Sequence, residues 1–312
     1  AIGGIAEITI KKGSLDNLDI FNRLPEPRGV DNFENVAAFS SENKVHILSG
    51  ETLKTITNPW FSYIHTVDIN RKNKDHLLVS SSGFDCIFEY SISDKAQTYE
   101  WFAWENGFNQ GLDPETAEKI YLTRKAKEAE QYQKKGKNFL FIRKPQEQIL
   151  PTAKRAAFIN SVIYDPEDSN KMIATFFHEG AVYQINRKTG KSTKVLDGLK
   201  SPHGGMKMKY NQFMGTNTAK GEIVTGNLDV QNIYDFSKLE GKPKMLGDME
   251  WIQNTKLHKG MFIAIDSNRN AIMIIHPDKK LISPVTYNAN WAIQDLVISN
   301  LNENQKYIIK NL

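Results

Sequence analysis

The chain has 312 residues, 40% of them hydrophobic, and a formal net charge of only +4. No apolar run approaches the length of about 20 residues that a membrane-spanning helix needs, so we expect a soluble protein with no membrane contact. A nucleic-acid-binding protein usually has a more strongly basic surface than this net charge allows, so we expect no nucleic-acid partner. The single cysteine, Cys86, cannot form an intrachain disulfide, and no signal peptide is visible, which together favour a cytoplasmic location.

Two candidate strands, Ile5–Ile10 and Leu18–Phe21, open the chain, and an internal repeat follows them. Each repeat places a hydrogen-bonding side chain ahead of an alternating strand. The six segments are Pro27–Val30, Ile64–Val67, Ile159–Val162, Pro202–Gly205, Ile252–Thr255 and Ile293–Leu296. Most spacings are about 40 residues, the length of one four-stranded propeller blade.

Further strands follow the repeat segments in the expected order. They are Leu77–Ser81, Cys86–Ser91 and Gln97–Phe102 in the second blade, Asn160–Tyr164, Met172–Phe177, Ala181–Ile185 and Ser192–Leu196 in the third, and Met261–Ile265, Ala271–Ile275 and Leu281–Thr286 in the fifth. After Gln294 there is room for only two more, Leu296–Ile298 and Tyr307–Ile309. Together with the two N-terminal strands they complete one blade. The sequence therefore predicts an all-β, six-bladed β-propeller whose last blade is closed by N- and C-terminal strands.

A long segment, residues 105–154, separates the second and third blades of this single domain. Asp113 and Pro114 resemble a helix start, so we expect a helix from there to about Lys134, followed by an apolar extended piece at Phe139–Ile142. Long connections between compact repeats are uncommon unless they bind or cover something. We expect this partly helical, basic insertion to act as a lid over the central channel.

The repeat segments resemble six-bladed propellers of the NHL-repeat and SMP-30/gluconolactonase/strictosidine-synthase-like group. The resemblance rests on Pro27–Asp31, on Pro202–Gly204 and on the blade ending Gly180–Lys191, and it extends over nearly the whole chain. It implies the architecture rather than the chemistry, because such folds carry lactonases, esterases, lyases, condensing enzymes and plain binding proteins.

One residue of each repeat should line the mouth of the channel. These six residues are Arg28, His65, Asn160, His203, Gln253 and Gln294, and we call them the polar ring. All are hydrogen-bonding types, although a packed channel could have used apolar residues. The turns between second and third strands should add Asp85, His178, Glu179, Lys220 and Arg269 on the same face.

The histidines allow two kinds of chemistry. His65, His203 and His178 could hold a divalent transition metal such as zinc or iron, whereas calcium is disfavoured because the ring has no carboxylates. Without metal, the same histidines suit proton transfer, helped by Asp85 and Glu179. Asn160, Gln253, Gln294 and the cations Arg28, Lys220 and Arg269 would then bind the substrate.

Two classes of function remain open. The polar ring favours an enzyme, a hydrolase or lyase, that acts on a small anionic molecule. Alternatively, the propeller binds a protein or peptide through this face and the basic insertion without catalysis. The ring histidines could also be structural groups hydrogen-bonded around ordered water.

Overall fold

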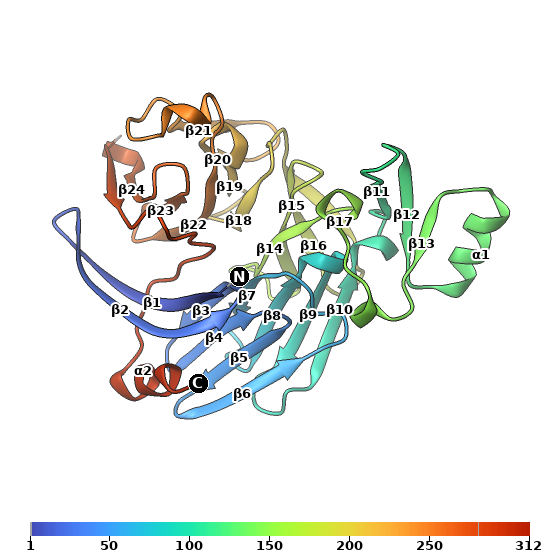
Figure 1. Cartoon of the computed structure of the whole chain (residues 1–312), viewed down its shortest axis with the longest axis horizontal. Helices are drawn as coiled ribbons and strands as arrows, with labels where there is room; N and C mark the ends of the chain where they lie inside the picture. The colour runs from blue at the N-terminus through green and yellow to red at the C-terminus, as the bar shows by residue number, and fades with distance from the viewer. Residues whose placement is uncertain (1, 280) are drawn as a thin grey trace.

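The computed structural model describes residues 2–279 and 281–312, and strands dominate it (Figure 1). Five antiparallel sheets of four strands each follow one another along the chain. Their strands are β3–β6 (Pro27–Phe33, Val36–Ser41, Lys44–Ser49, Thr52–Thr57), β7–β10 (Ile64–Ile69, His76–Ser81, Cys86–Ser91, Gln97–Phe102), β14–β17 (Ile159–Tyr164, Lys171–Phe176, Ala181–Asn186, Ser192–Leu196), β18–β21 (His203–Lys207, Phe213–Asn217, Glu222–Gly226, Gln231–Asp235) and β22–β25 (Ile252–His258, Met261–Asp266, Ala271–His276, Leu281–Thr286). The first strand of each sheet contacts that of the next, as the innermost strands of a propeller do. The predicted β-propeller is confirmed, with strand bounds within one residue of those expected in the second, third and fifth blades.

The sixth position of the ring is built differently from the other five. The N-terminal strands β1 (Ile2–Lys11) and β2 (Ser14–Pro25) form a two-stranded hairpin, as predicted. The hairpin contacts β25 of the last blade and β3 of the first. The two predicted C-terminal strands are wrong: residues 287–302 contain no strand, and the chain ends in helix α2 (Glu303–Lys310).

Helix α2 forms because its sequence carries a capping box. The side chain of Asn302 accepts a hydrogen bond from the backbone N–H of Gln305, and the side chain of Gln305 accepts one from the backbone N–H of Asn302. The helix buries Ile309 in one cluster with Phe21 and Leu24 of β2 and with Phe39 of the first blade. Burial of one such side chain stabilises the fold by about 1.5–3 kcal/mol. The C-terminus therefore closes the ring by packing on the hairpin rather than by strand pairing.

The insertion between the second and third blades also differs from the prediction. It contains a three-stranded sheet of β11 (Gln110–Leu112), β12 (Lys119–Thr123) and β13 (Phe139–Phe141), with helix α1 limited to Ala126–Lys134. The predicted helix start at Asp113 is wrong, because Asp113 lies in the turn between β11 and β12 and its backbone N–H donates to the carbonyl of Glu118. Helix α1 projects away from the blades, at the right of Figure 1. The end of the insertion lies against the third blade, where the carbonyl of Thr152 accepts a hydrogen bond from His178.

Candidate functional site

The residues of the polar ring occupy equivalent places in the five four-stranded blades. Each innermost strand leaves its pairing register near its start, which marks a β-bulge. Arg28, His65, Asn160 and Gln253 lie within the bulges, and His203 lies immediately before one. A bulge bends its strand and redirects a side chain. The structure therefore places five of the six predicted ring residues at the same end of their strands.

The sixth residue, Gln294, lies in the strand-free C-terminal segment, and its side-chain amide donates to the carbonyl of Ala292 at 3.4 Å. Its neighbour Asp295 connects the last four-stranded blade to the first. The Asp295 carboxylate accepts hydrogen bonds from Asn254 of β22 at 2.5 Å and from the backbone N–H of Val30 of β3 at 3.2 Å. This segment thus substitutes for a sixth innermost strand.

The proton of His65 can be placed from its hydrogen-bond partners. Nδ1 of His65 lies 3.1 Å from Oγ of Ser82. Ser82 donates its own hydroxyl proton to the carbonyl of Ile159, so it can only accept from the imidazole. His65 therefore carries its proton on Nδ1 and keeps a free electron pair on Nε2.

His203 repeats this arrangement two blades further along the chain. Its Nδ1 lies 3.1 Å from the carbonyl oxygen of Ser201 and 2.8 Å from Oγ1 of Thr218. The carbonyl accepts only, and Thr218 donates its proton to the carbonyl of Ile252 at 2.7 Å. The Nδ1–H tautomer is again selected, and Nε2 keeps its electron pair.

Both imidazoles are held in the neutral form. Burial, followed by the electrostatic effects of His203, Arg28 and Arg155, lowers the pKa of His65 well below its usual range. Burial also lowers the pKa of His203, to about 4, against the opposing effect of the Ser201 carbonyl. At neutral pH both imidazoles are therefore neutral, with Nδ1 protonated, and can act at Nε2 as bases or hydrogen-bond acceptors.

Two arginines converge beside His65. The guanidinium carbons of Arg28 and Arg155 lie 4.1 Å and 4.5 Å from the centre of the Tyr63 ring, and Arg155 also lies 4.8 Å from the centre of the Phe158 ring. Arg155 directly follows the insertion as we bounded it from the sequence, and its Nε donates to the carbonyl of Leu150 at 3.2 Å. Arg155 is not among the predicted site residues, because nothing in the local sequence distinguishes it from the other basic residues there.

Two buried polar atoms at this site have no hydrogen-bond partner among the described residues. They are Nη1 of Arg155 and Oδ1 of Asn160, and each residue is only 3% exposed. The amide nitrogen of Asn160 is occupied, because it donates to the carbonyl of Pro202 at 3.1 Å. Unsatisfied buried polar groups are costly and rare. A donor and an acceptor are thus left free next to the two neutral histidines.

The backbone is strained on the approach to the ring. Glu26, Tyr63, Phe158 and Ser201 each lie two residues before a ring residue, and each has a positive φ, between 43° and 55°. For Tyr63 and Phe158 this conformation is unfavourable because their side chains are bulky. Such strain concentrates at functional sites. Here it sets the two aromatic rings beside His65, at centroid distances of 6.1 Å and 5.4 Å.

Asp85 anchors the insertion rather than standing free for catalysis. Its buried carboxylate accepts hydrogen bonds from Nε1 of Trp104 at 3.1 Å and from the backbone N–H groups of Ala156 at 2.7 Å and Phe158 at 2.6 Å. Burial raises its pKa, although these three hydrogen bonds oppose the shift. Asp85 therefore fastens both ends of the insertion to the second blade.

His178 and Glu179 lie on the exposed surface of the third blade. Nε2 of His178 lies 2.9 Å from the carbonyl of Thr152, to which it donates, and its ring packs on Phe158 and Phe177. Among the described residues, Glu179 accepts one hydrogen bond, a long one from the hydroxyl of Tyr183 at 3.5 Å. His178 thus holds the returning end of the insertion near the ring.

The two remaining predicted cations differ in their surroundings. Lys220 ends the short 3-10 helix η5 (Thr218–Lys220) and is exposed. Arg269 is buried, and its Nη1 forms ion pairs with Glu250 at 2.7 Å and Asp266 at 2.9 Å. The structure therefore places Arg269 in a stabilising network and leaves its charge neutralised.

The predicted metal ligands do not form a cluster. Among residues 2–279 and 281–312, no three His, Cys, Asp or Glu side chains come together as ligands for one ion. Nε2 of His65 and Nε2 of His203 both have electron pairs suited to a metal, but Nε2 of His178 is engaged with Thr152. Metal binding therefore stays a prediction that needs its own measurement.

Comparisons with known proteins place the chain by fold alone. No family model and no curated protein sequence matches it. Among solved structures, a nidogen/laminin complex contains a chain that is 8% identical, with a TM-score of 0.59 and coverage of 91% of this chain and 90% of that chain. A streptogramin B lyase is 12% identical, with a TM-score of 0.50 and coverage of 84% and 83%. Both likenesses support the propeller architecture. No helix in the part of the chain that the structure describes has the length and apolar character to cross a membrane.

Proposed function

We propose that the polar ring binds a small anionic molecule and acts on it by proton transfer through His65 and His203. The observation that carries this proposal is the pair of neutral imidazoles, each held as the Nδ1–H tautomer, with Nε2 left free. No described residue hydrogen-bonds to either Nε2 atom, and the buried Nη1 of Arg155 near His65 has no partner among these residues. A single bound anion could meet both needs.

The anionic group of the substrate would bind to Arg28 and Arg155. Both guanidinium groups are held over Tyr63, and Nη1 of Arg155 has no partner within the described chain. Arginine recognises carboxylates and phosphates by charge-assisted hydrogen bonds. An anion bound here would also offset the positive charges that depress the pKa of His65, which would strengthen this imidazole as a base.

Elimination is the reaction that we would test first. Nε2 of one histidine takes a proton from a carbon next to the anionic group, the electron pair forms a double bond and the leaving group departs with its own pair. The imidazolium then returns the proton to the leaving group, so the step balances. The streptogramin B lyase provides this analogy at the level of fold. Hydrolysis, with a water molecule as the proton donor to Nε2, is the second reaction class.

The returning end of the insertion would cover the bound molecule. Thr152 is tied to His178, and the backbone N–H groups of Ala156 and Phe158 are tied to Asp85, so Arg155 is carried to the ring on a fixed segment. In this proposal the lid is this short segment, because α1 projects outward (Figure 1).

The test is a screen for substrate consumption. The purified protein is incubated with a mixture of small anionic metabolites, and each compound is followed by mass spectrometry. We expect at least one anion to be consumed by the wild-type protein and by a His46→Ala control, but not by His65→Ala or His203→Ala. His46 is a suitable control because its Nδ1 lies 3.1 Å from Oγ1 of Thr55, within the outer strands of the first blade. If the screen shows no consumption, or equal consumption by all four proteins, the proposal is wrong.

A further inference from the structure

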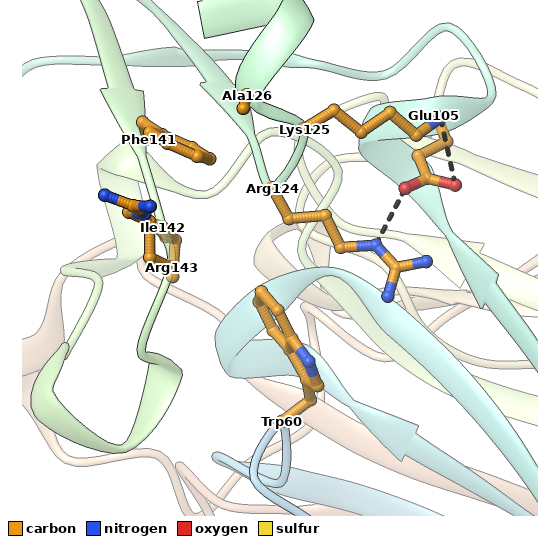
Figure 2. A pocket seen from close by; sticks show the side chains of 8 residues that line it. All are labelled: Trp60, Glu105, Arg124, Lys125, Ala126, Phe141, Ile142 and Arg143. Atoms are coloured by element: carbon orange, nitrogen blue, oxygen red, sulfur yellow. Dashed lines mark hydrogen bonds and ion pairs between the residues drawn. The ribbon is translucent and has the colours of Figure 1, made fainter.

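A pocket of about 510 Å³ lies between the insertion and the second blade, outside the polar ring (Figure 2). Eight residues line it: Trp60, Glu105, Arg124, Lys125, Ala126, Phe141, Ile142 and Arg143. Its volume falls within the range of about 300–1,000 Å³ typical of small-molecule sites. No ring residue contributes to it, so its occupant would not compete directly for the ring histidines.

The lining is strongly cationic. Three cations line the pocket, Arg124, Lys125 and Arg143, with one carboxylate, that of Glu105. Glu105 accepts from Nε of Arg124 at 2.7 Å and lies 3.3 Å from Nζ of Lys125. Burial alone would raise the pKa of Glu105, but its hydrogen bond with Arg124 and the charges of Arg124 and Lys125 outweigh burial and lower it. The Glu105 carboxylate therefore forms ion pairs with both Arg124 and Lys125.

Arg143 carries the charge that is not neutralised. It is exposed, and among the described residues it forms no ion pair, its one aromatic neighbour being Phe141 at 5.5 Å. Arg124, by contrast, is fixed by a second ion pair, from Nη2 to Glu100 at 2.7 Å. Lys125 is paired with Glu105 at 3.3 Å and with Glu128 at 3.9 Å, so Arg143 is the cation of the lining that an entering anion would find without an ion pair among the described residues.

The Trp60 wall of the pocket is held in place by neighbouring aromatic side chains. The Trp60 ring packs edge-on against Phe84, Phe102 and Trp104, at centroid distances of 5.5, 5.0 and 6.2 Å. The Arg124 guanidinium lies 3.7 Å from the centre of the Phe102 ring. Figure 2 shows Trp60 on one side of the space and Phe141 on the opposite side. A preformed site loses little entropy when a ligand binds.

We propose that this pocket is a second binding site, which takes a small aromatic anion. The flat ring of the ligand would lie between Trp60 and Phe141, and its carboxylate would pair with Arg143, since the Lys125 side chain extends away from Arg143 to Glu105 (Figure 2). The site goes beyond the proposed reaction at the ring and does not depend on it. Part of the pocket wall belongs to the insertion, which leads directly into Arg155. A ligand in the pocket would therefore reduce the mobility of the insertion.

Benzoate is the probe, with benzylamine as a cation of similar shape, and binding is measured by isothermal titration calorimetry. We expect saturable binding of benzoate and none of benzylamine. Arg143→Glu should raise the Kd for benzoate about tenfold or more, since it replaces an attractive charge by a repulsive one. Lys125→Glu should raise it less, because Lys125 is paired with Glu105 away from Arg143 (Figure 2). Lys144→Glu is the matched control, because Lys144 is a neighbouring exposed cation that does not line the pocket and pairs with Glu147.

A ring variant separates the two sites. Arg28→Glu should leave the benzoate affinity of the pocket unchanged, whatever it does to turnover. The proposal is overturned by an absence of saturable binding, by equal losses in Arg143→Glu and Lys144→Glu, or by binding that Arg28→Glu abolishes while Arg143→Glu does not. Circular dichroism of each variant checks that the fold is intact, and both pocket substitutions are at exposed positions.

Discussion

The hydroxyl of Ser82 accepts a hydrogen bond from Nδ1 of His65 and donates one to the carbonyl of Ile159 in the next blade. These two hydrogen bonds connect the turn of the second blade to the imidazole of His65 and to the innermost strand of the third blade. Thr218 plays the same part for His203. The tautomer of each ring histidine is thus set by a hydroxyl in the turn after the second strand of its own blade.

Removing the hydroxyl of Ser82 should allow His65 to populate both of its neutral tautomers. In Ser82→Ala, Nδ1 of His65 and the carbonyl of Ile159 both lose their partner, so the free energy of unfolding should fall by about 1–2 kcal/mol. Nitrogen-15 NMR should then show both neutral tautomers of His65, whereas Ser82→Thr should restore the Nδ1–H form. A single unchanged tautomer in Ser82→Ala would show that another group holds the imidazole.

The depressed pKa values of the histidines predict how stability depends on pH. An unfolded histidine titrates near 6.5, whereas the pKa of His203 in the fold is about 4. Between these values the unfolded chain binds the proton and the folded chain does not, so stability falls as pH falls through this window. Urea unfolding at several pH values should show a smaller loss in His203→Ala than in wild type. Parallel curves for the two proteins would contradict the assignment.

Asp85 should matter more for stability than for proton transfer. Asp85→Asn keeps the shape but turns an acceptor into a donor that faces backbone N–H groups, so we expect a loss on the order of 3 kcal/mol. Because the carboxylate joins Trp104 to Ala156 and Phe158, limited proteolysis should cut the insertion faster in this variant. Glu179→Gln, an exposed change in the same face, should alter neither property.

Elemental analysis tests the metal hypothesis, on protein that has never contacted a nickel column. If His65 and His203 hold a transition ion, near-stoichiometric zinc or iron should be present and should be lost in both alanine variants. Metal-dependent turnover would follow. Metal that persists in both variants would place its ligands outside the ring.

Five of the six residues of the polar ring could be placed from the sequence, because they repeat at the spacing of the blades. In the structure each of the five lies in or beside a β-bulge at the start of its innermost strand. Arg155 and the strained aromatics Tyr63 and Phe158 could not be placed in this way, because their importance arises only when distant segments meet. The two free polar atoms are likewise a property of packing. Arg269 is a different case: its spacing of three from Asp266 could have indicated an ion pair instead of a substrate contact.

The errors in the fold have local causes. The Asn302 and Gln305 capping box was a readable signal for α2, but the apolar pair Ile308–Ile309 suggested a strand needed to complete a blade. In the insertion, Asp113 followed by Pro114 fits a helix start and a tight turn equally well, and pairing of β11 with β12 selects the turn.

The tautomers of His65 and His203 test the central claim most directly, because they can be measured without knowing the substrate. Nitrogen-15 NMR of the histidine-labelled protein at pH 7, assigned with His65→Ala and His203→Ala, reports the protonation of each ring nitrogen. We predict that both imidazoles are neutral, with the proton on Nδ1 and an unprotonated Nε2. Imidazolium rings, or protons on Nε2, would contradict the proposed proton-transfer site.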